Sequence, residues 1–262
     1  MVACGVQEIG GQRRATWGVK VICITHHLLT GPLALAALLQ DPIVAKALTC
    51  LGCEEAAWSM ARDTSLGPPP GVRALMPITL GYMLGDLALL PCWGAWGPEG
   101  RRVARADDAI MIAHHALSIA IWPMTVYYNY CSRYVLIMIS TEFSSIFMTC
   151  NWFLTTLGRK SDLIYKVNGL IFTLTFVVVR MVGAVPQLVA MFRVPPWTMS
   201  TMRAVAPDVD IQWWQVYACS AMVLPHCLNL FWGVKVIKGY LKVHNAYFEA
   251  RRKGRADGKK KT

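Results

Sequence analysis

Two adjacent histidines, His114 and His115, lie near the start of the apolar stretch AHHALSIAIWPMTVYYNY, residues 113–130. An imidazole titrates close to neutral pH, so it can act as a general base, accept an acyl group or recognise a polar head group. An ionisable group in hydrocarbon is costly unless it is paired or hydrated, and it marks a functional site by default. The candidate catalytic residues are therefore His114 and His115, with Asp86 as the carboxylate that orients one of them.

The helical geometry of this pair limits what it can do. Adjacent helical residues point about 100° apart, so one imidazole can face a cavity while the other reaches a second helix or a carbonyl. Two such histidines cannot readily hold one metal ion together, and the chain has no H-x-x-x-H or H-x-x-H-H spacing. We expect no metal site, and the sequence leaves open which histidine faces the cavity.

Further polar residues interrupt the apolar segments, and we expect them to be lipid-binding or structural: His26, His27, Glu142, Asn151, Arg180 and His226. Counting at about 1.5 Å per residue places the histidines and Asp86 in one layer of the cytosolic half, with Asn151 shallower. Glu142 and Arg180 lie deeper, and their opposite charges suggest an ion pair. A histidine that bonds to a helix backbone is the alternative, and His226 could bond to the carbonyl that Pro225 frees.

The elements that position these residues are transmembrane helices. The 262-residue chain is 55% hydrophobic and 16% charged, and its mean hydropathy is +0.40, values typical of a multi-pass membrane protein. The predicted fold class is therefore all-α, a polytopic bundle of about six transmembrane helices. Six segments have about the length that crosses a bilayer: Val21–Gln40, Ala74–Cys92, Asp108–Tyr128, Tyr134–Leu154, Asn168–Phe192 and Gln212–Val234. The weaker segment Pro42–Ala61 carries charges, and we interpret it as a surface or loop helix.

The distribution of Lys and Arg predicts the topology. With six crossings, one side of the membrane collects 19 of the 26 basic residues, which places both termini in the cytosol. The expected organisation is a cytosolic N-terminal segment at 1–20, a transmembrane domain at 21–234 and a basic cytosolic tail at 235–262. Ten basic residues lie in that tail, where they suit anionic lipid head groups, so the net charge of +11 does not indicate nucleic acid.

Three short patterns carry weaker expectations. Cys50 and Cys53 form a C-x-x-C, but neither a thioredoxin-like context nor a second C-x-x-C accompanies it, so we expect neither redox chemistry nor a zinc site. Gly81-x-x-x-Gly85 predicts close helix packing. The C-terminal KKKT fits a dilysine signal at Lys259 and Lys260, which coat proteins would read to return the protein to the endoplasmic reticulum.

Four motifs in order along the chain carry a family resemblance: GYMLGD at 81–86, HH at 114–115, TEFSSIFMTCNWF at 141–153 and FVVVR at 176–180. Together they resemble the TLC domain family (TRAM, LAG and CLN homology) over residues 20 to 236. The chain is most similar to the small TLC-domain-containing proteins. Ceramide synthases have further Asp residues after the His pair, whereas Glu142 is the only acid between Ala116 and Asn151 here.

The resemblance implies membrane-lipid biology in the endoplasmic reticulum, with membrane lipids as partners. We expect a role in lipid homeostasis through binding or sensing of lipid. One alternative is a ceramide-synthase-like acyltransferase that uses the His pair, for which acyl-CoA would be a substrate and no resident cofactor is expected. The other alternative is a trafficking, cargo-receptor or translocation-associated protein.

Overall fold

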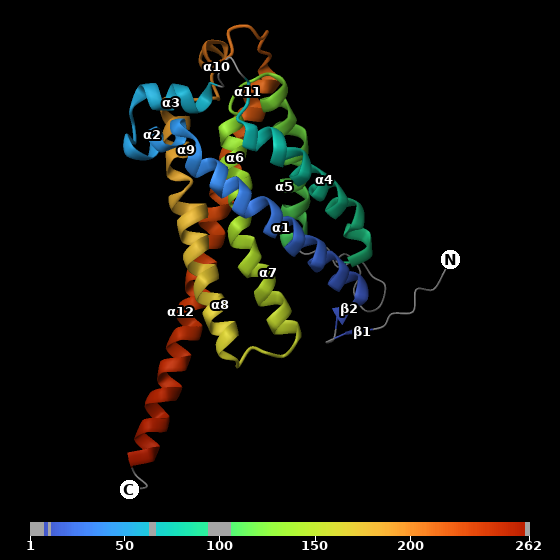
Figure 1. The fold of residues 1–262 in the computed structure, drawn as a ribbon, viewed down its shortest axis with the longest axis vertical. Helices are drawn as coiled ribbons and strands as arrows, with labels where there is room; N and C mark the ends of the chain where they lie inside the picture. The colour runs from blue at the N-terminus through green and yellow to red at the C-terminus, as the bar shows by residue number, and fades with distance from the viewer. Residues whose placement is uncertain (1–7, 10–11, 63–66, 94–105, 260–262) are drawn as a thin grey trace, which may run out of the picture.

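The computed structural model describes residues 8–9, 12–62, 67–93 and 106–259, and nearly all of them are helical (Figure 1). The elements are β1 (Glu8–Ile9), β2 (Gln12–Arg13), α1 (Arg14–Gln40), α2 (Pro42–Thr49), α3 (Glu54–Ala61), α4 (Pro70–Trp93), α5 (Ala106–Tyr127), α6 (Ser132–Ser140), α7 (Glu142–Thr156), α8 (Leu163–Thr175), the π-helix η1 (Phe176–Val182), α9 (Val185–Arg193), α10 (Met199–Val205), α11 (Trp213–Ser220), the 3₁₀ helix η2 (Ala221–Val223) and α12 (Leu224–Lys259). The antiparallel pair β1–β2 is two residues long in each strand.

Six helical spans in the described part of the chain are long and apolar enough to cross a membrane, which confirms the predicted all-α class. They are Trp17–Gln40, Pro70–Leu89, Ala109–Tyr127, Ser132–Thr156, Leu163–Arg193 and Trp213–Asn245. The last span exceeds its expected end at Val234 because α12 runs unbroken to Lys259. The basic tail is therefore helical through Lys259, while Lys260 lies outside the described residues.

The first three spans are single helices, whereas the last three are interrupted. Thr141 separates α6 from α7, η1 lies between α8 and α9, and η2 precedes α12. Each interruption lies beside an expected site residue: Glu142 follows Thr141, Arg180 lies within η1, and His226 follows η2. Interrupted backbone is tolerated at membrane depth only where it is buried in protein or lines a cavity. The breaks therefore mark where the bundle has a polar interior.

Helix α1 crosses the bundle obliquely and packs on α4, α6 and α7 (Figure 1). Its close approach to α7 depends on Gly31, since a Cβ there would lie 2.5 Å from the backbone nitrogen of Phe143. All nine residues of α6 are buried, which makes it the central element of the bundle. The contact at Gly31 brings the preceding turn of α1 against the first turn of α7, where Glu142 lies.

The expected surface segment Pro42–Ala61 forms α2 and α3, which at eight residues each are too short to cross a bilayer. They pack with α9 at one end of the bundle (Figure 1). A buried ion pair fixes this cap, with Arg133 Nε 3.1 Å from Asp41 Oδ2. Cys50 and Cys53 are joined as a disulfide between α2 and α3, a pairing that the sequence analysis did not expect.

Candidate functional site

The two histidines of α5 point to different surroundings, as their adjacent positions require. His115 turns toward α4, where its Nδ1 lies 3.3 Å from Asp86 Oδ2, and both side chains are buried. His114 instead lines an apolar pocket of about 360 Å³ formed mainly by α5 and by residues 221–228. The expected division of the pair is present, and the carboxylate orients His115 while His114 is the member that faces a cavity.

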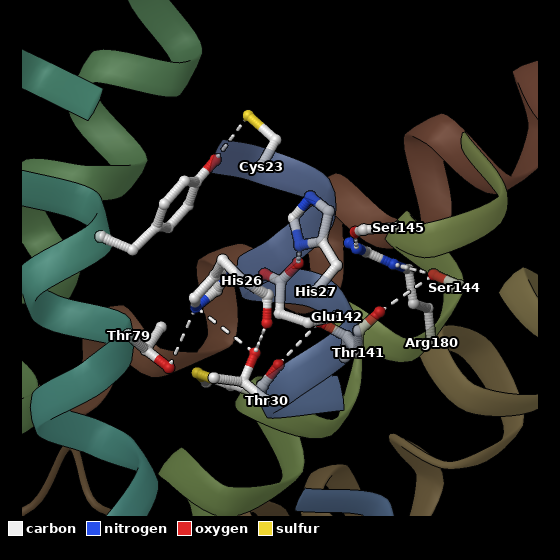
Figure 2. Close-up of polar contacts among 12 residues, drawn as sticks. Cys23, His26, His27, Thr30, Thr79, Thr141, Glu142, Ser144, Ser145 and Arg180 are labelled. Carbon is white, nitrogen blue, oxygen red and sulfur yellow. Dashed lines mark hydrogen bonds and ion pairs between the residues drawn. The ribbon is translucent and has the colours of Figure 1, made fainter. Parts of the chain in front are cut away.

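The histidine pair of α1 is divided in the same way (Figure 2). His27 Nδ1 lies 2.9 Å from Glu142 Oε2 on α7. His26 Nε2 lies 3.4 Å from Thr79 Oγ1 on α4 and 3.3 Å from Thr30 Oγ1 one turn along its own helix. Both imidazoles are buried, so these contacts hold α1 between α4 and α7.

Tyr82 of α4 connects the two histidine pairs. Its ring stacks on His26 with centroids 4.0 Å apart and meets His115 edge-on at 6.2 Å. Its hydroxyl lies 3.2 Å from the sulfur of Cys23 on α1. The aromatic ring therefore fills the space between α1, α4 and α5 without adding a charge.

The expected ion pair between Glu142 and Arg180 is wrong. Glu142 contacts His27, and Arg180 donates instead to neutral oxygens, Ser144 Oγ and Ser145 Oγ, each at 2.7 Å (Figure 2). Arg180 also donates to Asn229 Oδ1 at 3.1 Å. Depth counted along a helix does not fix the direction in which a side chain points. Three hydrogen bonds to oxygens satisfy the guanidinium on three of its donors without neutralising its charge.

A small polar chamber of about 40 Å³ lies at the centre of these contacts, lined by residues that include Glu142, Arg180, Asn229, His226 and His114. It adjoins the apolar pocket, because both cavities share the lining residues His114, Trp122, Met138, Pro225 and Leu228. His114 therefore stands where an apolar cavity meets a polar one.

His226 is buried in this chamber, and neither ring nitrogen has a hydrogen-bond partner among the described residues. The expectation that His226 bonds to a carbonyl freed by Pro225 is therefore wrong for this conformation. Native proteins rarely leave a buried polar group unsatisfied, so such a group calls for a water or a ligand.

The model of the TLC domain family matches residues 16–238 of this chain. The chain belongs to the TLC domain family. Human TLC domain-containing protein 4 is 25% identical over 92% of this chain and 80% of its own length. The Xenopus tropicalis protein of that name is 27% identical over 92% and 81%, and Danio rerio TLC domain-containing protein 4-B is 23% identical over 94% and 80%. No solved structure matches the chain.

One expected residue lies away from the centre of this TLC domain. Asn151 accepts a hydrogen bond from Asn168 Nδ2 at 2.8 Å and lines a separate groove near α8 and α12. The expected packing role of Gly81 and Gly85 is also wrong, since a Cβ at either position would meet nothing within 4 Å. The other expected site residues gather around α1, α4, α5, α7, η1 and α12.

One cluster of possible metal ligands lies in the described part of the TLC domain. His26, His27 and Glu142 each offer one ligand atom, and these atoms lie within 4.8 Å of one another, so the cluster could hold an ion. The expectation of no metal site stays a prediction. In the present arrangement, however, His26 Nε2 is directed at Thr30 and Thr79, and His27 Nδ1 at Glu142.

The sequence analysis missed several polar residues that complete the site: Thr30, Thr79, Tyr82, Ser144, Ser145 and Asn229. Helical spacing could have found some of them. Thr30 lies four residues after His26, and Asn229 lies three after His226, spacings that put each pair on one helix face. Ser145 lies three residues after Glu142 and has the same signal. Ser144 does not, because it is only two residues from Glu142.

Proposed function

We propose that this TLC domain protein binds a membrane lipid and acts in membrane lipid homeostasis. An acyl chain would occupy the apolar pocket, and the polar part of the lipid would enter the chamber past His114. The observation that carries the proposal is His226, a buried imidazole without a partner in a chamber that joins an apolar pocket.

The apolar pocket suits an acyl chain. Ile110, Leu117, Ile121 and Leu228 are among its lining residues, and Leu117 and Leu224, which both line it, are exposed at the surface. That outer surface faces hydrocarbon when the spans cross a bilayer, so a lipid can enter laterally without passing through water. The side chains that line the pocket would contact the acyl chain of the bound lipid in place of the acyl chains of bulk lipid, at similar polarity.

The chamber suits a neutral polar group that can both donate and accept hydrogen bonds. Glu142 supplies acceptor oxygens, Arg180 supplies N–H donors, and each ring nitrogen of His226 can do one or the other. An amide or a hydroxyl-bearing ester meets these needs within a small volume. A charged ligand group would be poorly accommodated, because Glu142 and Arg180 already hold opposite charges on the chamber wall.

Acyl transfer is the second candidate, favoured by the position of His114 at the boundary where an acyl carbonyl would lie. The carboxylate expected to orient a catalytic histidine, Asp86, contacts His115, and His115 does not line either cavity. A catalytic His114 would therefore have to work with Glu142 across the chamber. This separation makes lipid binding the better supported function, with acyl-CoA as a substrate only in the second case.

The cellular setting belongs to the same proposal. With six spans, the two termini of the chain would lie on one side of the membrane, and the excess of basic residues on that side supports cytosolic termini. The proposal extends to residence in the endoplasmic reticulum, which the resemblance to the TLC family implies. We keep a trafficking role as the third alternative, and stable protein partners that persist in His114→Ala would favour it.

The test compares lipids that co-purify with wild type, His114→Ala, His226→Ala and the control Met111→Ala. Met111 lies on α5 and is exposed, but it lines neither cavity. We expect one lipid class to be enriched over bulk membrane in wild type and Met111→Ala, and depleted at least severalfold in the other two. Equal lipid profiles for all four proteins, matching bulk membrane, would refute binding at this site.

Microsomes that contain wild type or His114→Ala, supplied with labelled acyl-CoA, separate binding from catalysis. Lipid binding predicts no labelled product that depends on the protein. A labelled lipid that forms with wild type and Met111→Ala, but not with His114→Ala, would establish acyl transfer instead.

A further inference from the structure

The short helices α2 and α3 meet at a turn that holds the C-x-x-C of the chain. The disulfide between Cys50 and Cys53 lies in this turn, and the two Cα atoms are 5.6 Å apart. The turn packs against α9 at one end of the bundle (Figure 1), where both cysteines border a small hollow with Pro186 and Val189. Both cysteines are half-buried, so a small molecule can reach the bridge from outside.

The disulfide is not needed to close the turn. The backbone N–H of Cys53 donates to the carbonyl of Cys50 at 3.1 Å, and Gly52 between them has φ +88°, which glycine adopts without strain. The buried pair of Arg133 and Asp41 fixes the same cap independently. A disulfide stabilises least when it closes a short loop, and this one closes only residues 50–53. We therefore expect the cap to stay in place when the bridge opens.

The surroundings of Cys53 favour its thiolate form. Cys53 is the N-cap of α3, where the positive end of the helix dipole lies. Arg193, the last residue of α9, brings its guanidinium to the same turn, since a Cβ at Gly52 would lie 3.4 Å from Arg193 Nη2. A helix N-terminus and a neighbouring cation each stabilise a thiolate, which makes Cys53 the better leaving group of the bridge.

Two acidic residues also lie at this turn, and both have other partners. Glu55 in the first turn of α3 forms an ion pair with Lys46 of α2 at 2.8 Å. Glu54 Oε1 accepts a hydrogen bond from Trp58 Nε1 at 3.4 Å. Arg193 is exposed and has no acidic partner in the described part of the chain, so its charge is available to the turn.

We propose that Cys50 and Cys53 form a reversible redox site that exchanges with a small-molecule thiol of the glutathione class, with Arg193 stabilising the Cys53 thiolate. The C-x-x-C alone gave no expectation of redox chemistry, because the helix N-terminus and the cation come from separate parts of the chain, α3 and α9. With cytosolic termini, this turn between the first two spans faces the opposite compartment, where disulfides persist. The site is independent of the lipid pocket.

The exchange takes two steps. A thiolate RS⁻ attacks the Cys50 sulfur, so that a mixed disulfide forms, the Cys50–Cys53 bond breaks and Cys53 leaves as the thiolate. A second RS⁻ then attacks the sulfur of the bound thiol, which releases RSSR and leaves Cys50 as a thiolate. The bridge gains two electrons and, at neutral pH, two protons, while two RSH are oxidised to one RSSR.

The first test equilibrates purified full-length protein in detergent with glutathione buffers that range from fully oxidised to strongly reducing. Maleimide labelling and peptide mass spectrometry count the free thiols at Cys50 and Cys53. We expect the pair to interconvert and to reach the same reduced fraction from both directions. A bridge that stays closed in a large excess of reduced glutathione, or thiols that never pair in oxidised glutathione, would overturn the proposal.

The second test concerns Arg193. Arg193→Gln should slow reduction by glutathione about two- to fivefold, the effect of one partly exposed charge. Arg203→Gln on α10 is the matched control, since it is also an exposed arginine in the last turn of a short helix. Uncharged dithiothreitol should show the same slowing, because the effect lies in the leaving thiolate. Slowing with anionic glutathione alone, or equal rates in the two variants, would refute the role of Arg193.

A pH profile and a stability measurement separate this role from a structural one. In reduced protein, alkylation of Cys53 by iodoacetamide should reach its half-maximal rate at higher pH in Arg193→Gln than in wild type or Arg203→Gln. An unchanged midpoint would contradict thiolate stabilisation. The variant Cys50→Ser/Cys53→Ser should keep a thermal midpoint close to that of wild type. A large loss would show that the bridge holds the cap together and would overturn the proposal of a reversible site.

Discussion

The two His-His pairs, on α1 and on α5, are identical as dipeptides and similar in the way they are divided. In each pair the second member contacts a carboxylate on a neighbouring span, His27 with Glu142 and His115 with Asp86. The first members differ. His26 is enclosed by Tyr82, Thr30 and Thr79, whereas His114 opens onto two adjoining cavities. The surroundings of the first histidine therefore decide whether a pair holds helices together or is available to a ligand.

The carboxylate contacts also differ between the pairs. His27 Nδ1 lies 2.9 Å from Glu142, while His115 Nδ1 lies 3.3 Å from Asp86. Glu142 further lines the chamber with Arg180, and Gly31 presses α1 against α7 beside it. We therefore expect the α1 pair to contribute more to stability than the α5 pair.

The largest expected effect comes from His27→Ala. Removal of this imidazole leaves Glu142 without its ion-pair partner inside the bundle, and loss of one member of a buried pair costs about 3–5 kcal/mol. The free energy of unfolding would be measured by SDS titration in mixed micelles. The double variant His27→Ala/Glu142→Gln should recover part of the loss, because no charge then remains unpaired at this contact. A double variant no more stable than His27→Ala would contradict the pairing.

Much of the fold follows from the sequence because transmembrane length and apolarity are local properties. The six spans are present as predicted, and Pro42–Ala61 forms two helices too short to cross a bilayer. The breaks at Thr141 and in η1 were not predicted, since they depend on how spans pack against one another. The pairing of Arg133 with Asp41 joins residues 92 positions apart, and no periodicity within one helix could indicate it.

The sequence predicted which residues belong to the candidate site better than it predicted the contacts between them. Residue type and depth selected Asp86, His115 and His226, all buried in the bundle. Depth also suggested that Glu142 pairs with Arg180. The direction in which each side chain points around its helix instead brings Glu142 against His27. Sequence spacing fixes which residues share a helix face, and it does not fix which face meets which neighbour until helix crossings such as that at Gly31 are known.

An intermediate effect is expected for Asp86→Asn. The amide keeps the size of the carboxylate but removes its charge, so the contact with His115 should weaken and the loss should be about 1–3 kcal/mol, the cost of a weakened buried contact. The same SDS titration measures it beside His27→Ala. A loss as large as that of His27→Ala would mean that the two carboxylate contacts are equivalent and would remove the contrast between the pairs.

The smallest effect on stability is expected for His114→Ala, although this variant should change ligand binding most. His114 borders open cavities, so its truncation enlarges existing space and should cost about 1 kcal/mol or less without added lipid. A ligand that binds only the folded state raises stability in proportion to its occupancy, so added lipid should stabilise wild type and Met111→Ala more than His114→Ala. Thermal midpoints of delipidated protein, with and without an extract of its native membrane lipids, measure both quantities. If His114→Ala lowers the midpoint as much as His27→Ala before any lipid is added, the α5 pair is structural like the α1 pair, and the open side of His114 carries no special role.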